Sequence, residues 1–225
     1  TQVPELLTSG ARIVVIDHHR RAATYIKNAT LTLYEPNASS SCELVTELMQ
    51  ELCEPADILP FEADAVLSGI VLDTKSFTIR TGDRTFDAAA FLRRSGADTT
   101  HVKKLFQNGM EETMERYDIM KQARIYKGIA VVAAQETQNR IVAAQAADEL
   151  LNISGVNASA VLYPTGDGGV AVSARSIGDV NVQVLLETLG GGGNRSAAGA
   201  QIANCTVRDA VNKLFASIDE YRATE

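Results

Sequence analysis

The sequence predicts an α/β fold in two parts: a parallel sheet with flanking helices, followed by a smaller α+β domain with a mixed sheet. Helical patterns that alternate with continuous apolar runs, typical of the buried strands of a parallel sheet, indicate the first part. Strand-like runs close together in the chain, two of them separated by the hairpin signal DGG, indicate the second. We therefore predict a first part at residues 1–107, a connecting helix or linker at 108–124, and a second domain at 125–225.

One strand and three helices are predicted in the first part. Residues 12–17, RIVVID, predict a buried strand because four apolar residues run together into a polar cluster. In 39–52, apolar residues recur at helical spacing behind serines that suit an N-cap. Residues 61–74 are rich in Ala and Leu and close on Asp73, and 83–97 form a short helix that ends at a glycine.

A charged, amphipathic pattern over 110–126 predicts a helix that connects the two parts. The second domain then alternates between the two periodicities of strands and helices. Strand-like runs are predicted at 128–136, 158–176 and 201–207, and helices at 145–154, 180–189 and 208–222.

Composition limits the class of protein. The chain has 225 residues, of which 45% are apolar and 22% charged, as in ordinary globular proteins. Its net charge of −7 disfavours binding to duplex nucleic acid, which depends on basic surface, but is compatible with a small phosphate-bearing ligand in a local basic pocket. The three cysteines form no CxxC pair, so neither a zinc site nor a disulfide framework is predicted and a reducing cytosol is expected.

Apolar runs in the chain are far shorter than the ~20 residues that span a bilayer. A soluble chain without membrane contact is therefore expected. The sequence begins without methionine and reaches a predicted core strand within about ten residues. We therefore expect this chain to be a piece of something longer.

Asp17, His18 and His19 follow the strand at 12–17 directly, and the chain has only three histidines. Ligands of parallel sheets collect beyond the carboxyl ends of the strands, and carboxylate with imidazole suits a divalent first-row metal. Asp73 also follows an apolar run, and a neighbouring strand end would bring it beside this triplet. We interpret these residues as a metal site. The other interpretation, a capping histidine beside a solvated one, stays open.

A run of four glycines, 190–193, lets backbone N–H groups approach an anion closely. Arg195, just after the run, and Arg175 are candidates for charge-assisted bonds to phosphate. A flexible hinge is the alternative for any glycine run. The small-residue segment that follows inside a folded domain favours a ligand loop.

The motifs VIDHH and LDT, with a glycine-rich loop before AAG, resemble those of the DHH phosphoesterases that carry a DHH-associated C-terminal domain. The blocks VIDHHRR, LDTKSFTIRTGDRTFDAAAFLRRSGADT and VSARSIGDVNVQVLLETLGGGGN are most similar to the cyclic di-AMP phosphodiesterases of the GdpP type. The similarity covers essentially the whole chain. It implies a partial DHH domain at 1–107 and a substrate-binding domain at 125–225.

The resemblance implies hydrolysis of cyclic di-AMP to linear pApA, with a pair of manganese ions (Mn2+) between the two domains. It implies a longer parent enzyme, anchored in the bacterial cell membrane with this part on the cytoplasmic side, and it leaves a homodimer open. Carried over by motif, His18 and Asp73 are implied metal ligands, Asp17 orients them and His19 faces the substrate phosphate. Residues implied to hold the nucleotide are Arg175, Gly191, Gly192, Gly193, Asn194 and Arg195.

Two departures from the family pattern qualify this expectation. An upstream HxxxDxD motif and a further metal-binding Asp have no match in the sixteen residues before Asp17. Asn194 stands where the family usually has histidine, and its amide can donate a hydrogen bond but carry no charge, so weaker phosphate binding is predicted. Two alternatives therefore stay open: an oligoribonuclease with pAp phosphatase activity that acts on short oligonucleotides, and a nucleotide-binding module without catalysis.

Overall fold

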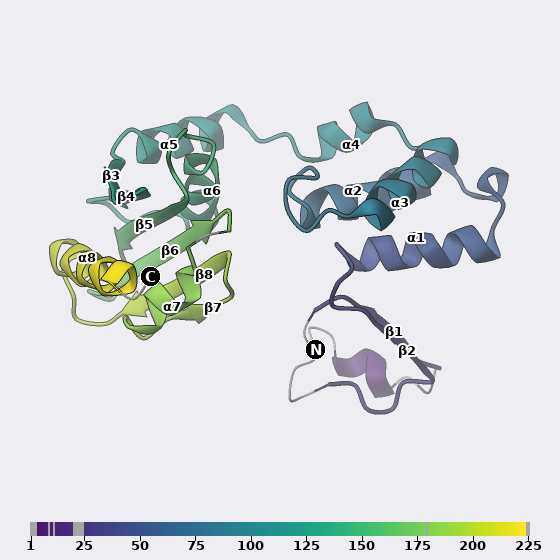
Figure 1. The fold of residues 1–225 in the computed structure, drawn as a ribbon, viewed down its shortest axis with the longest axis horizontal. Coiled ribbons are helices and arrows are strands. Elements are labelled where there is room, and N and C mark those ends of the chain that lie inside the picture. The colour runs from purple at the N-terminus through teal and green to yellow at the C-terminus, as the bar shows by residue number, and fades with distance from the viewer. Residues whose placement is uncertain (1–3, 9, 11, 20–24, 179, 224–225) are drawn as a thin grey trace. The chain divides into compact units, whose positions relative to one another are not determined.

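The computed structural model describes residues 4–8, 10, 12–19, 25–178 and 180–223 (Figure 1). The chain divides into two units, Thr1–Gln107 and Asn108–Glu225. The elements of the first unit are η1 (Pro4–Thr8), β1 (Val14–Asp17), β2 (Leu31–Tyr34), α1 (Ser41–Leu52), η2 (Pro55–Asp57), α2 (Pro60–Asp73), α3 (Asp83–Arg94) and α4 (Thr99–Leu105).

The sheet of the first unit is small and parallel. β1 and β2 pair in parallel, with Asp17 of β1 opposite Tyr34 of β2 at their carboxyl ends. The parallel pairing predicted for this part is confirmed. β2 was not among the predicted strands. Its sequence, LTLY, is short and partly exposed, so it gives no strong strand pattern.

The helices α1 to α4 form the core of the first unit, and the predicted helices at 39–52, 61–74 and 83–97 are confirmed. Local signals begin and end them. Ser40 caps α1 by accepting a hydrogen bond from the Glu43 amide at 3.0 Å, and Pro60 opens α2. After α3, Gly96 takes a φ of +104°, which lets the chain turn back. The buried side chains of this core are Ile58, Ala63, Leu67, Ile70, Ala88, Phe91, Leu92, Ala97 and Val102.

The second unit is a six-stranded mixed sheet with helices on both faces. Its elements are α5 (Met110–Met120), β3 (Arg124–Tyr126), β4 (Ile129–Ala133), α6 (Arg140–Leu150), β5 (Ala158–Pro164), β6 (Val170–Ser176), α7 (Val182–Glu187), β7 (Gly192–Gly193), β8 (Ala197–Ile202) and α8 (Val207–Ala223). The strand order is β3-β4-β5-β6-β8-β7, in which β4 and β5 are parallel and the other neighbours antiparallel. The predicted mixed sheet is confirmed.

Two apolar clusters cover the two faces of this sheet. One packs alternate residues of β4, β5, β6 and β8 against α7 and α8, with Leu186, Leu214 and Ile218 among its most buried members. The other packs β4 and β5 against α5 and α6, with Val132 and Leu150 at its centre. Figure 1 shows α5 and α6 on one side of the sheet and α7 and α8 on the other. None of the described helices is long and apolar enough to cross a membrane.

Several predicted boundaries in the second unit were wrong, among them that of the helix predicted over 145–154, which is α6 at Arg140–Leu150. The helix expected over 110–126 ends at Met120, and Arg124–Tyr126 forms β3, because Lys127 and Gly128 adopt left-handed φ values of 49° and 78° that turn the chain back onto β4. The strand expected over 201–207 is the end of β8, which starts at Ala197 and stops at Ile202. Thr206 then accepts a hydrogen bond from the Asp209 amide at 3.1 Å, and α8 begins at Val207.

Candidate functional site

His18 is a buried histidine whose two ring nitrogens both face oxygen atoms. It follows Asp17, the last residue of β1, and only 5% of it is exposed. Its Nδ1 lies 3.4 Å from the Ala38 carbonyl oxygen, and its Nε2 lies 3.5 Å from Oδ2 of Asp73. The structure therefore brings His18 and Asp73 together.

Asp73 reaches His18 from a helix and not from a neighbouring strand, which corrects the expectation. It is the last residue of α2, and Thr74 follows, buried, with its hydroxyl accepting a bond from the Phe77 amide at 2.9 Å. Lys75, Ser76 and Phe77 adopt φ values of 47°, 58° and 64°. Three successive left-handed residues without glycine cost free energy, and such strain is concentrated at functional sites.

Asp17 and His19 form a second pair beside the first. Oδ1 of Asp17 accepts hydrogen bonds from the backbone N–H of His19 at 3.0 Å and from its Nδ1 at 2.7 Å. Partial burial alone would raise the pKa of Asp17, but the bonds from His19 outweigh it and hold the pKa below its usual value. The side chain of His19 is 74% exposed, and its ring meets that of His18 edge-on with centroids 4.4 Å apart. Asp17 thus orients the exposed imidazole.

Two described residues lie together with side chains that could bind a metal. His18 Nε2 and the Asp73 carboxylate are suitable donors for a divalent first-row cation. No group of three or more His, Cys, Asp or Glu among the described residues is arranged to hold a metal. Such cations take four or more ligands, so this pair by itself would fill only part of a coordination shell.

A cavity of about 650 Å³ lies in the second unit. Its floor is the sheet face beside α6, where β6 and β8 present small residues that pair across the strands, including Ser173 with Gly199 and Ala171 with Gln201. The buried members of the apolar cluster on this face come from β4 and β5, with Ala171 of β6 packed against its edge. The volume is typical of a pocket for a small molecule.

Arg175 lines the cavity and is held in place from behind. Its Nε donates to Asp148 Oδ2 at 3.2 Å, and Nη1 donates to the Ala174 carbonyl at 2.9 Å. The side chain is 18% exposed. An arginine fixed in this way presents the rest of its guanidinium to an anion with little further loss of conformational freedom.

The glycine run is the end of a helix followed by a strand, as well as a wall of the cavity. Gly190 takes a φ of +75° just past α7, and the Gly190 and Gly191 amides donate to Glu187 and Leu186 carbonyls at 3.0 and 2.8 Å. Gly192–Gly193 then pairs with β8. Two of the four amides are therefore committed to the end of the helix.

Asn194 makes contacts within its own loop, and Arg195 contacts the segment between β6 and α7. Oδ1 of Asn194 accepts from the amides of Ser196 and Ala197 at 3.0 and 2.9 Å and from the Ser196 hydroxyl. These bonds close the turn between β7 and β8, so the Asn194 side-chain oxygen stabilises the loop. Nε of Arg195 donates to the Gly178 carbonyl at 3.0 Å.

Sequence reasoning missed three residues that line the cavity, Arg140, Tyr163 and Thr165. Arg140 is the first residue of α6, behind the N-cap Asn139. A cation at a helix N-terminus interacts unfavourably with the helix dipole. The place of Arg140 at the start of a helix was therefore a signal in the sequence that this residue could have a function. Burial raises the pKa of Tyr163, while the charge of Arg140 acts in the opposite direction.

The family models match both units. The model described as DHH family, N-terminal domain, matches residues 1–70, and the DHHA1 domain matches 127–224. A cyclic-di-AMP phosphodiesterase GdpP of Geobacillus thermodenitrificans is 48% identical over 219 residues, which is 96% of this chain and 33% of that protein. The cyclic-di-AMP phosphodiesterase PdeA of Listeria monocytogenes is 43% identical over 96% of this chain and 34% of its own length. The chain thus spans about a third of these relatives.

A solved structure shows the same fold. The crystal structure of an exopolyphosphatase-related protein from Bacteroides fragilis superposes with a TM-score of 0.83, over 97% of this chain and 66% of the other. The two sequences are 21% identical, so this likeness concerns the fold alone.

Proposed function

The chain belongs to the DHH family and carries a DHHA1 domain, and on that premise we propose that it is a phosphodiesterase region that hydrolyses cyclic di-AMP to linear pApA. One observation carries the proposal: three cyclic-di-AMP phosphodiesterases are 43–48% identical to this chain over 93–96% of its length. We propose further that the region acts at the cytoplasmic side of a bacterial membrane, within a longer protein.

In this proposal His18 and Asp73 hold metal, for which we propose manganese, with Nε2 and a carboxylate oxygen as donors. When bound, the metal supplies an activated water and neutralises charge that develops on the phosphate. A hydrogen bond from Nδ1 of His18 to the Ala38 carbonyl would leave Nε2 as the ligand to the metal. His19, exposed and held by Asp17, contacts the phosphate of the substrate.

The cavity of the second unit binds the nucleotide. Arg175 and Arg140 provide two cations at its wall, which suits a ligand with two phosphates. The small side chains on the floor, such as Ala171 and Gly199, leave room for a flat base to lie against the sheet. The backbone of the glycine run approaches the ligand closely because it has no side chains.

The test is a substrate panel with this chain and manganese: cyclic di-AMP, pAp and a short oligoadenylate, with products separated by chromatography. We expect pApA from cyclic di-AMP. His18→Ala or Asp73→Asn should lower the rate a hundredfold or more, because several kcal/mol of transition-state stabilisation depend on the ligands. His101→Gln, at the third histidine, exposed on α4 beside Asp64, should leave the rate unchanged. Preference for pAp or the oligonucleotide would instead support an oligoribonuclease.

A nucleotide-binding module without catalysis is the second candidate, and the two-residue donor set favours it. Calorimetric titration of cyclic di-AMP without metal separates the two. Binding that Arg175→Gln and Arg140→Gln weaken, with no turnover when manganese is added, would support the module and contradict the enzyme.

A further inference from the structure

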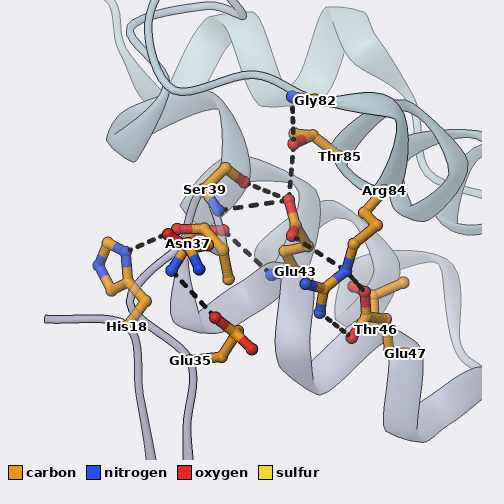
Figure 2. A network of polar contacts seen from close by, with 12 residues as sticks. His18, Glu35, Asn37, Ser39, Glu43, Thr46, Glu47, Gly82, Arg84 and Thr85 are labelled. Carbon is orange, nitrogen blue, oxygen red and sulfur yellow. Dashed lines mark hydrogen bonds and ion pairs between the residues drawn. The ribbon is translucent and has the colours of Figure 1, made fainter.

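Glu43 is a buried carboxylate that the proposed chemistry leaves without a role. It lies in the first turn of α1 and is 2% exposed. Its Oε2 accepts hydrogen bonds from the hydroxyls of Ser39 and Thr85, both at 2.6 Å, and from the Ser39 amide at 3.4 Å. Figure 2 shows this carboxylate at the centre of a polar network between α1 and α3.

Hydroxyl groups, and not a close ion pair, compensate this charge. Nε of Arg84 is 3.9 Å from Oε1 of Glu43, and the guanidinium forms its short bonds, 2.7 and 2.8 Å, to Glu47. A buried charge without a close counter-ion is costly, and an apolar residue of similar volume would often be more stable at such a position.

The segment that Glu43 holds also carries the acceptor for His18. Ala38, Ser39 and Ser40 are at most 1% exposed. Glu43 binds both the amide and the hydroxyl of Ser39, and the adjacent Ala38 carbonyl accepts from Nδ1 of His18. On the other side, Thr85 accepts from the Gly82 amide at 3.1 Å, which ties the network to the start of α3. Contacts thus run without a break from α3 through Glu43 to the imidazole.

We propose that Glu43 is a positioning residue for His18: it fixes the Ala38 carbonyl, which contacts Nδ1 and so holds the imidazole with Nε2 toward Asp73. Partners that hold a metal-binding histidine in this way set its tautomer and orientation. The inference rests on the proposed function, because that function assigns His18 to metal. It concerns the metal-free imidazole as well, so it can be tested separately.

The experiment uses long-range ¹H–¹⁵N spectra of the metal-free chain, which report the surroundings of each ring nitrogen. Three histidines make assignment by single substitution direct. We expect the ring ¹⁵N signals of His18 to move in Glu43→Gln, because the Ala38 carbonyl is no longer held beside Nδ1, with those of His101 unchanged. Glu47→Gln is the matched control: it lies on the same helix and breaks the exposed bond to Arg84, and it should leave His18 unaltered.

Ser39→Ala is the second variant, in case Glu43→Gln does not fold, because it removes one donor and keeps the carboxylate. Titration with manganese alone, followed by broadening of the His18 signals, should require about tenfold more metal in either variant. Unchanged ring ¹⁵N signals of His18 in folded Glu43→Gln and Ser39→Ala would overturn the inference. Altered signals with no manganese binding in the parent chain would support the role of Glu43 and count against the proposed metal site.

Discussion

Gly191 and Gly193 show at the residue scale why the glycine run is needed. A Cβ at Gly191 would meet the Gly199 carbonyl oxygen at 2.5 Å, and one at Gly193, where φ is +153°, would meet the Ala197 carbonyl. A Cβ at Gly192 would meet nothing within 4 Å. The run therefore allows β8 to approach closely, in addition to bordering the cavity.

We predict that Gly191→Ala and Gly193→Ala each lower the free energy of unfolding by about 1–3 kcal/mol, because backbone atoms must move apart. Gly192→Ala should change it by less than about 0.5 kcal/mol. Urea unfolding followed by circular dichroism measures the difference. Equal stability of all three variants would contradict the packing argument.

The pH dependence of stability should show the contribution of Asp219 on α8. Hydrogen bonds from Lys127 Nζ at 2.6 Å and from the Tyr126 hydroxyl at 2.7 Å hold its pKa below the ordinary value of 3.8. A lowered pKa stabilises the fold above the ordinary value, and this contribution is lost as the pH falls through the folded pKa. Asp219→Asn should therefore be less stable than the parent at neutral pH and equal to it in strong acid. Thermal unfolding across pH checks this, and a gap that persists in acid would contradict it.

At the element scale, the turn after α2 holds three left-handed residues in succession directly after Asp73 and Thr74. Ser76 holds a left-handed φ of 58° between two other left-handed residues. Glycine adopts this conformation without the steric cost that a Cβ brings.

We predict that Ser76→Gly raises the free energy of unfolding by up to about 1 kcal/mol. Thermal unfolding measures this as a higher melting temperature. Ser68→Gly, inside α2, is the matched control and should lower stability by about 0.5–1 kcal/mol, since glycine weakens a helix interior. Changes of the same sign in both variants would show that strain at Ser76 is not relieved.

At the scale of the whole molecule, the two units have separate cores. Every buried residue of the two apolar clusters around the six-stranded sheet lies at Ile119 or later, and the cluster of the helical unit ends at Val102. A unit that buries its own apolar surface has the driving force to fold alone.

We predict that residues 108–225, expressed alone, fold with a cooperative thermal transition and bind cyclic di-AMP without metal. Circular dichroism and calorimetry test both points, with Arg175→Gln as the control for the cavity. An unfolded product would mean that the first unit contributes to the core of the second.

What the sequence by itself determined follows from near neighbours. Helical spacing, the serine before α1 and the glycine after α3 predicted the helices, and DGG predicted the turn between β5 and β6. These signals act between residues close in sequence, so they can be recognised without knowing how the chain folds in three dimensions. The motif at Asp17 to His19 was visible for the same reason.

The tertiary structure alone decided which distant residues meet. Asp73 reaches His18 from a helix end, and Glu43 reaches the Ala38 segment and Thr85 at once. Arg140 came to border the cavity because α6 packs across β5 and β6 and places its first residue at the cavity wall. Such contacts depend on how whole helices and strands pack. Packing is decided by the burial of the entire core, which no local sequence pattern describes.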